Sequence, residues 1–433
     1  MYKKIFNIAI PMILSAISIP MLGIVDTAIL GHLDSPKYLA AINIGATIFN
    51  VLFWGFGFLK MSTTGLIAQS SGEKNQIKIN LQLTQALLIA AIIALILLIF
   101  QKWLGHYSIN FATSKGVIAD MAHDYFSIRI FSAPATLIIY VFVGYFLAIG
   151  QSKVVLLIMV VNQVGNMFLD YLFVMKFNYG IAGVAYGSLI SEYLALLTGI
   201  YFLFKTTYKV PCLQQLKKWL SQKEEIKQFF MLNRDIFIRT LCLMAVFALM
   251  TKGSARLGEL SLAGNAVLLN FFYLMSYGLD GFAHAVESLC GKYYGARDKK
   301  QFKAIIRSVF ILSFTVAASF SLIYLIFGKQ LIYLLTSIES VQNYSYDYII
   351  WLIIIPLISM PSFVYDGIFI ATTNAKIMRN SMVIATFFCY IPLWYLLRRF
   401  DNHGLWIAFL SFFIVRSTTI HLYYRKWIKQ WEK

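Results

Sequence analysis

Charged residues are scarce in this chain of 433 residues, because Asp, Glu, Lys and Arg together make up only 13% of it. A water-soluble domain carries about 25% charged residues, so the composition excludes an ordinary soluble protein. Hydrophobic residues make up 59% of the chain. They gather into runs long enough to cross a bilayer as helices, which takes about 20 residues. The sequence therefore predicts an all-α polytopic membrane protein.

Cysteine and histidine are also rare, with four and six residues. The cysteines form no CxxC pair and the histidines form no ligand pair at helical spacing, so neither a disulfide framework nor a metal-ligand motif is indicated. No nucleophile–base constellation of the kind that an enzyme needs is evident. We therefore expect a protein that is not an enzyme and that carries no cofactor.

Acidic residues are about half as numerous as basic ones, 19 against 37, which gives a net charge of +18. Assigning loops alternately to the two sides of the membrane places 24 of the 37 basic residues on the side of both termini. That bias predicts a multi-pass protein of the cell inner membrane with both termini in the cytoplasm. The orientation in the membrane therefore accounts for the excess of Lys and Arg, and we expect no nucleic-acid partner.

Apolar runs of spanning length predict twelve transmembrane helices. Their expected ranges are 7–31, 38–66, 80–104, 123–148, 152–176, 181–204, 236–258, 262–290, 303–327, 346–372, 377–397 and 404–424. The longest polar connection, 205–235, divides them into two sets of six. We therefore expect an N-terminal lobe (1–204), a cytoplasmic linker (205–235) and a C-terminal lobe (236–433).

The two halves resemble each other at a constant offset of 223 residues. Because each half has an even number of spans, both enter the membrane from the same side, and the repeats are parallel. Two lobes of this kind rock about a central site in many transporters. The matching pairs include Gly55 with Gly278, Gly72 with Gly295, Gly144 with Gly367, Phe146 with Phe369, and Lys153 with Lys376.

The first span carries a single acid, Asp26, and two prolines, Pro11 and Pro20. Proline removes a backbone hydrogen bond and bends a helix. A carboxylate inside a span is costly and usually faces a cavity or an ion path. A bendable helix with one titratable group is the layout expected of a proton or cation switch. The alternative is a kinked helix whose acid is hydrated at the interface.

The fifth span presents Asn162, Asn166 and Asp170 at intervals of four residues, which places them on one helical face. With Asp26 as a partner, these oxygens could share a proton or hold Na⁺. The alternative is a polar seam that joins helices. Ser188 and Glu192 on the sixth span are weaker candidates.

The second half has polar groups of its own. Asp280, His284 and Glu287 fall on one face of the eighth span, and Asp366 follows two prolines in the tenth. At the offset of 223, these three acids, like Asp26 and Asp170, each map to an uncharged residue of the other half. The lobes are therefore expected to share a scaffold but not a chemical role.

Five stretches resemble the multidrug and toxic compound extrusion (MATE) family, and within it the DNA-damage-inducible F (DinF) branch. Because they are spread in order over both halves, the resemblance covers essentially the whole chain. The second of them departs from the branch at Lys60, where we would expect Arg. The stretches are VDTAILGHL (25–33), GFLKMSTTGLIAQ (57–69), LNRDIFIR (232–239), LDGFAHAVESLCGKYYGARD (279–298) and DGIFIATTNAKIMRNSM (366–382).

The resemblance implies an antiporter that exports organic, often cationic and amphipathic compounds in exchange for H⁺ or Na⁺, with the DinF likeness favouring H⁺. It implies that Asp26 is the first-helix carboxylate whose protonation or cation binding bends that helix at Pro11. Asn166 and Asp170 match the family's fifth-helix partners. Ser188 stands where some members have a hydroxyl ligand.

We therefore expect alternating access by two lobes, with small-molecule substrates, the lipid bilayer as surroundings, and one chain as the functional unit. The nearest alternative is a flippase for lipid-linked precursors, which would favour a lumen rich in Lys and Arg. We assign only Lys60, Arg129, Arg239 and Arg416 to the interior of spans and the other basic residues to loops and span ends. A sensor or scaffold would leave the intramembrane acids unexplained.

Overall fold

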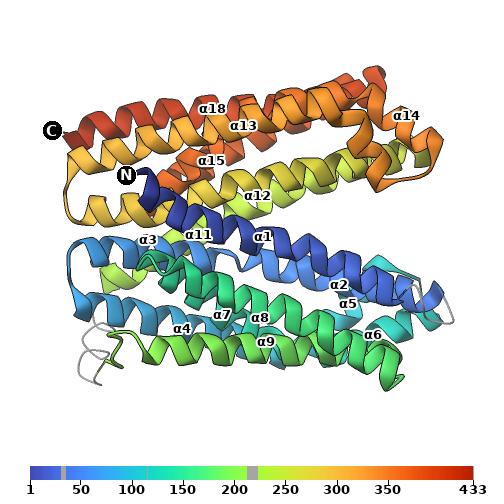
Figure 1. Ribbon diagram of the computed structural model, residues 1–433, viewed down its shortest axis with the longest axis horizontal. Helices are drawn as coiled ribbons and strands as arrows, with labels where there is room; N and C mark the ends of the chain where they lie inside the picture. The colour runs from blue at the N-terminus through green and yellow to red at the C-terminus, as the bar shows by residue number, and fades with distance from the viewer. Residues whose placement is uncertain (31–35, 115, 212–222, 433) are drawn as a thin grey trace. The chain divides into compact units, whose positions relative to one another are not determined.

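The computed structural model describes residues 1–30, 36–114, 116–211 and 223–432, with the backbone alone for 21–30, 36, 223–226 and 432. Throughout these residues the chain is helical, and they contain no strand (Figure 1). The predicted all-α class is therefore confirmed. Long apolar helices are the natural outcome in lipid, because a helix satisfies its own backbone hydrogen bonds.

The chain divides into two compact units. The N-terminal unit comprises Leu14–Ile226, and the C-terminal unit comprises Lys227–Lys433 together with Met1–Ile13. The first helix, α1 (Tyr2–Leu30), therefore contributes to both units. The division within α1 falls two residues after Pro11.

In the N-terminal unit, α8 packs along α9, and α7 packs against α3 and α4. The regular α-helix of α8 ends at Asp170 and continues as a π-helix, η2. The elements that follow α1 are α2 (Pro36–Gly55), α3 (Phe58–Gly72), α4 (Gln76–Ile99), α5 (Gln101–Ala112), α6 (Val117–Arg129), η1 (Ile130–Ser132), α7 (Ala133–Ala148), α8 (Ser152–Asp170), η2 (Tyr171–Lys176) and α9 (Gly180–Phe204).

In the C-terminal unit, α12 packs against α13 and α15, and α15 also packs against α18 (Figure 1). The elements are α11 (Lys223–Arg256), α12 (Glu259–Gly295), α13 (Lys299–Leu335), α14 (Glu339–Asp347), α15 (Ile349–Ala371), α16 (Ala375–Val383), η3 (Ile384–Tyr390), α17 (Ile391–Leu396), η4 (Leu397–Phe400) and α18 (Asp401–Glu432).

Eleven helical stretches among the described residues are long and apolar enough to cross a membrane. The last of them, Ala375–Trp431, has 57 residues. At 1.5 Å per residue it would extend about 86 Å, far beyond the bilayer. It folds back at Asp401, whose φ is 47°, so that α18 packs against η3 and α17. Counted as two spans, it brings the total to the twelve that the sequence predicts.

The internal repeat is visible in how two glycines pack. A Cβ at Gly144 of α7 would lie 2.6 Å from the carbonyl oxygen of Lys60 in α3. A Cβ at Gly367 of α15 would lie 2.6 Å from the carbonyl oxygen of Ala283 in α12. All four positions obey the offset of 223. Small residues let membrane helices approach closely, so each unit uses the same glycine for the same helix contact.

The first half of α1 is packed against α12 within the C-terminal unit. Gly281 lies against Ala9 and Ile13, where a Cβ would be 2.9 Å from the carbonyl oxygen of Ala9. The rings of Phe6 and Phe282 meet edge to face, with centroids 6.1 Å apart. These contacts tie the start of the chain to residues about 270 positions later.

Candidate functional site

The polar face of α8 is the most buried group of polar residues in the predicted coupling region. Asp170 is 1% exposed and Asn166 is 3% exposed, whereas Asn162 is half-buried. The three residues share a face because they recur every four residues. A buried carboxylate within a span is expensive, so its surroundings decide what it can do.

Helix α9 supplies those surroundings. The Asn166 side-chain amide donates a hydrogen bond to the Ser188 hydroxyl oxygen at 2.9 Å. Gly187, the residue before Ser188, lies directly against the Asp170 carboxylate, and a Cβ there would collide with Oδ1. The structure thus brings Asn166, Asp170 and Ser188 together at one contact between α8 and α9. Only a glycine at position 187 leaves room for the carboxylate.

The first-span residues are only partly described. The backbone of Asp26 belongs to α1, but its side chain lies outside the described residues, so the predicted pairing of Asp26 with Asp170 remains a prediction. Pro11 is buried and Pro20 is exposed, and both lie within the helix.

A buried ion pair adjoins this polar contact. Arg129, at the end of α6, lies 2.8 Å from Glu192 of α9, and the two side chains are 15% and 8% exposed. Glu192 also accepts a hydrogen bond from Thr136 of α7. Arg129 in turn interacts electrostatically with Asp170. One arginine therefore connects the Glu192 carboxylate to the carboxylate of the polar face.

The sequence did not identify this ion pair, although it marked Arg129 as an in-span base and Glu192 as a weaker candidate. The signal that could have found it is charge balance, because a base within a span must pair with an acid or a carbonyl. Its partner is 63 positions away and on another helix, so spacing alone could not select it.

In the C-terminal unit, Asp366 of α15 is held by two arginines. Its Oδ2 atom accepts hydrogen bonds from Arg239 of α11, including one from Nε at 3.1 Å, and from Arg416 of α18. The three residues are 5%, 8% and 3% exposed. Asp280 of α12 also interacts electrostatically with Arg416. The Asp366 carboxylate is thus engaged by guanidiniums, and a cation there would have to compete with them.

The other second-lobe candidates form a separate pair. The Nδ1 atom of His284 lies 3.0 Å from Glu287 Oε2, one turn along α12, and Glu287 is 2% exposed. Within the described residues, no group of three or more His, Cys, Asp and Glu side chains is placed to hold a metal ion. Asp366 and Glu287, two of the acids predicted in the second lobe, are thus both engaged in ion pairs with residues of the C-terminal unit.

The fold and this distribution of buried charge are those of a polytopic membrane transporter. A sequence model of the MatE family matches residues 11–172 and 236–396, which covers both halves. The chain belongs to the MATE family, and its helices make it a multi-pass membrane protein. As a member of this family it is a transporter and not an enzyme.

Among known proteins, the chain is 35% identical to DNA damage-inducible protein F of Escherichia coli, over 98% of this chain and 92% of that protein. It is 23% identical to the probable multidrug resistance protein NorM of Thermotoga maritima, over 100% and 93%. The DinF likeness predicted from the sequence is confirmed.

Solved structures share the fold. A crystal structure of a MATE protein in complex with MaL6 has a TM-score of 0.88 at 19% identity, over 99% of this chain and 97% of that one. An outward-facing MATE transporter of the MOP superfamily has a TM-score of 0.86 at 18% identity, over 99% and 96%. Both cover the two lobes.

Proposed function

We propose that the protein is a secondary active antiporter that exports organic, cationic or amphipathic compounds in exchange for inward H⁺, with coupling in the N-terminal lobe. The observation that carries this proposal is the hydrogen bond from Asn166 to Ser188 beside the buried carboxylate of Asp170. Such a carboxylate is costly as an ion in a span, so a proton that neutralises it changes the stability of its surroundings. Substrate release would follow from that change.

The two lobes differ in a way that supports this assignment. The carboxylate oxygen of Asp366 accepts hydrogen bonds from two arginines. Asp170 faces Gly187, neighbours a hydroxyl and an amide, and interacts electrostatically with Arg129, which is paired with Glu192. Oxygen ligands of this kind suit H⁺ or a small hard cation such as Na⁺. We assign coupling to Asp170 with Asn166 and Ser188, Asn162 lining the same face and Asp26 contributed by α1.

In this mechanism α1 is the moving element. A proline within a helix removes one backbone hydrogen bond and creates a hinge. Pro11 lies two residues before the point where α1 passes from one unit to the other. Protonation of Asp26 would then alter the helix on one side of that hinge, and Pro20 would provide a second weak point.

Dye transport by the purified protein in liposomes tests the proposal. A fluorescent organic cation is loaded, and a pH gradient or a Na⁺ gradient is imposed separately. Movement driven by the pH gradient alone is expected. Movement that requires Na⁺ would replace H⁺ as the coupled ion, and no movement under either gradient would overturn the antiporter in favour of a flippase.

Two variants test the assigned residues in the same assay. Asp170→Asn and Asp26→Asn keep the shape of each side chain but remove the titratable group, so each should abolish gradient-driven transport. Asp347→Asn, at the end of α14 and before the spanning helix α15 begins at Ile349, is the control and should transport normally. Wild-type rates in the two membrane variants would show that the coupling groups lie elsewhere.

The protein also needs a defined membrane, orientation and number of chains. We propose that the protein lies in the cell inner membrane with both termini in the cytoplasm, and that one chain suffices because it supplies both lobes. The basic residues that favour the termini side support this orientation. Labelling of single cysteines introduced at each terminus, with an impermeant reagent on intact cells, tests it.

A further inference from the structure

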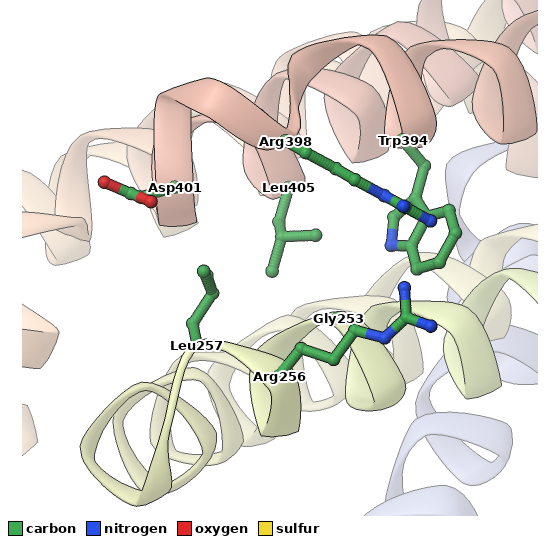
Figure 2. A pocket seen from close by; sticks show the side chains of 7 residues that line it. All are labelled: Gly253, Arg256, Leu257, Trp394, Arg398, Asp401 and Leu405. Atoms are coloured by element: carbon green, nitrogen blue, oxygen red, sulfur yellow. The ribbon is translucent and has the colours of Figure 1, made fainter.

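A small pocket lies at one end of the C-terminal unit and includes none of the residues assigned above. Its volume is about 130 Å³. It is formed where the last turn of α11 meets the fold-back between α17 and α18 (Figure 2). Its lining consists of Gly253, Arg256, Leu257, Trp394, Arg398, Asp401 and Leu405.

Two arginines share one indole ring at this pocket. The guanidinium carbon of Arg256 lies 5.4 Å from the ring centre of Trp394, and that of Arg398 lies 4.7 Å from it. Neither guanidinium group forms an ion pair or a hydrogen bond with a residue that the structure describes. Two like charges over one ring repel each other, and an anion between them would relieve that repulsion.

The indole nitrogen is a second, independent sign of a ligand. Trp394 is 9% exposed, and its Nε1 atom is buried without a hydrogen-bond partner among the described residues. Figure 2 shows this nitrogen on the edge of the ring that faces Leu405. Buried indole N–H groups normally find an acceptor. Cation–π contact accounts for the position of the arginines, but it provides no hydrogen-bond acceptor for the Trp394 N–H group.

Glycine at position 253 keeps the indole nitrogen open. A Cβ there would lie 2.8 Å from Nε1 and 2.6 Å from a methyl carbon of Leu405. Any larger side chain would therefore fill the space in front of the donor. The pocket thus offers one neutral donor and two charged donors around a small volume.

The depth of the pocket indicates where its ligand comes from. Asp401 is the first residue of α18, whose 32 residues extend about 48 Å. A bilayer with its headgroups is about 40–45 Å thick, so one end of α18 lies at headgroup level. The apolar residues Tyr395, Leu396 and Phe400 next to the pocket are each more than half exposed. Such a surface suits acyl chains below a headgroup.

We propose that this pocket binds the phosphate group of a phospholipid, whose oxygens accept hydrogen bonds from Trp394 Nε1 and from the guanidiniums of Arg256 and Arg398. Arginine forks match phosphate geometry, and charge-assisted hydrogen bonds are the strong ones. Inorganic phosphate offers the same chemistry without the acyl chains, and the experiment separates the two sources.

Asp401 refines the choice of headgroup. Figure 2 shows its carboxylate at the other end of the pocket from the indole ring. An acid in the first turn of a helix is stabilised by the helix dipole. Its negative charge disfavours a purely anionic headgroup and favours a headgroup that carries an amine beyond its phosphate. Phosphatidylethanolamine has that arrangement, whereas phosphatidylglycerol does not.

Native mass spectrometry of the purified full-length protein tests the proposal. Phosphatidylethanolamine, phosphatidylglycerol and inorganic phosphate are titrated separately. Wild-type protein is expected to retain lipid, and the Arg256→Gln, Arg398→Gln double variant to bind it at least about tenfold more weakly, the loss expected for one charge-assisted hydrogen bond. Trp394→Phe keeps the ring and removes the donor, and it should also weaken binding.

A matched control uses bases at the opposite end of α18. Arg425→Gln with Lys429→Gln removes the same charge and should leave lipid binding by the pocket unchanged. Asp401→Asn should lower the preference for phosphatidylethanolamine while binding of phosphatidylglycerol is kept. Equal lipid retention by wild type and the double arginine variant would overturn the site. Saturation by inorganic phosphate without retention of lipid would overturn the lipid assignment.

Discussion

The carboxylate of Asp170 lies directly against Gly187, so closely that a Cβ at position 187 would collide with it. This contact fixes the distance between α8 and α9 at the proposed coupling site. It also places Asp170 beside Ser188, the next residue along α9. Because glycine has no side chain, position 187 leaves the space that the Asp170 carboxylate occupies.

Gly187→Ala should inactivate transport while the protein still inserts into the membrane. The added methyl group forces the carboxylate or α9 to move, and overpacking of this kind costs about 1–3 kcal/mol. The measurement is dye efflux from liposomes, with insertion checked by size-exclusion chromatography.

Gly165→Ala is the control for this change. It lies on α8 and faces α9, but its Cβ would meet only the Cβ of Ser191, at 3.6 Å, an ordinary contact. It should transport like the wild type. Equal activity of both alanine variants would contradict the importance of the Asp170–Gly187 contact.

Ser188→Ala should reduce transport more than Ser188→Thr. Alanine leaves the buried Asn166 amide without its acceptor, which costs about 1–3 kcal/mol, whereas threonine keeps the oxygen. Initial rates of efflux at several external pH values compare the two. If threonine were as damaging as alanine, packing rather than the hydroxyl oxygen would be the important property of Ser188.

Glu192→Gln should destabilise the N-terminal unit by about 3–5 kcal/mol, because it leaves Arg129 buried without its charged partner. Unfolding in mixed micelles of sodium dodecyl sulfate and a mild detergent measures the change. The comparison is Glu73→Gln, which breaks an exposed pair with Lys78 at 3.0 Å and should cost about 0–1 kcal/mol. Similar losses in both variants would argue that the Glu192 pair is not buried in solution.

Asp366→Asn should destabilise the C-terminal unit, because Arg239 and Arg416 would face each other without the shared carboxylate. The expected loss is about 3–5 kcal/mol. Adding Arg416→Gln removes one of the two facing charges and should recover part of the stability. Folded yield and the midpoint of thermal unfolding, measured with and without Na⁺, test this. Stabilisation of the wild type by Na⁺ that Asp366→Asn abolishes would instead indicate a cation site.

Much of the fold follows from the sequence because the bilayer imposes it. Runs of apolar residues predicted the spans. The offset of 223 residues predicted that the two lobes share a scaffold, and the equivalent packing of Gly144 and Gly367 agrees with it. The break between α2 and α3 at Phe56 and Gly57 was not predicted, since the apolar run continues through it. The local signal for this break is the pair Gly55 and Gly57, and an isolated glycine in an apolar run is too weak a signal to predict a break.

The candidate site was predictable only where its residues share one helix. The interval of four residues placed Asn166 and Asp170 on one face, and the structure buries both. The arginine partners of Glu192 and Asp366 come from other helices, and the pocket at Trp394 joins residues that are about 140 positions apart. No spacing rule connects such residues, because helix packing and not sequence order brings them together.

The contact between Gly281 and Ile13 has a consequence for biosynthesis. The two residues are separated by 268 positions, and a ribosome that adds about 5–20 residues per second needs roughly 15–50 s to cover that interval. During this time the first turns of α1 are already made, but their partner helix does not yet exist. The beginning of the protein therefore reaches these neighbours in α12 only after the whole N-terminal lobe has been synthesised. A ribosome stalled before α12 is complete would leave those turns available to the insertion machinery or to lipid.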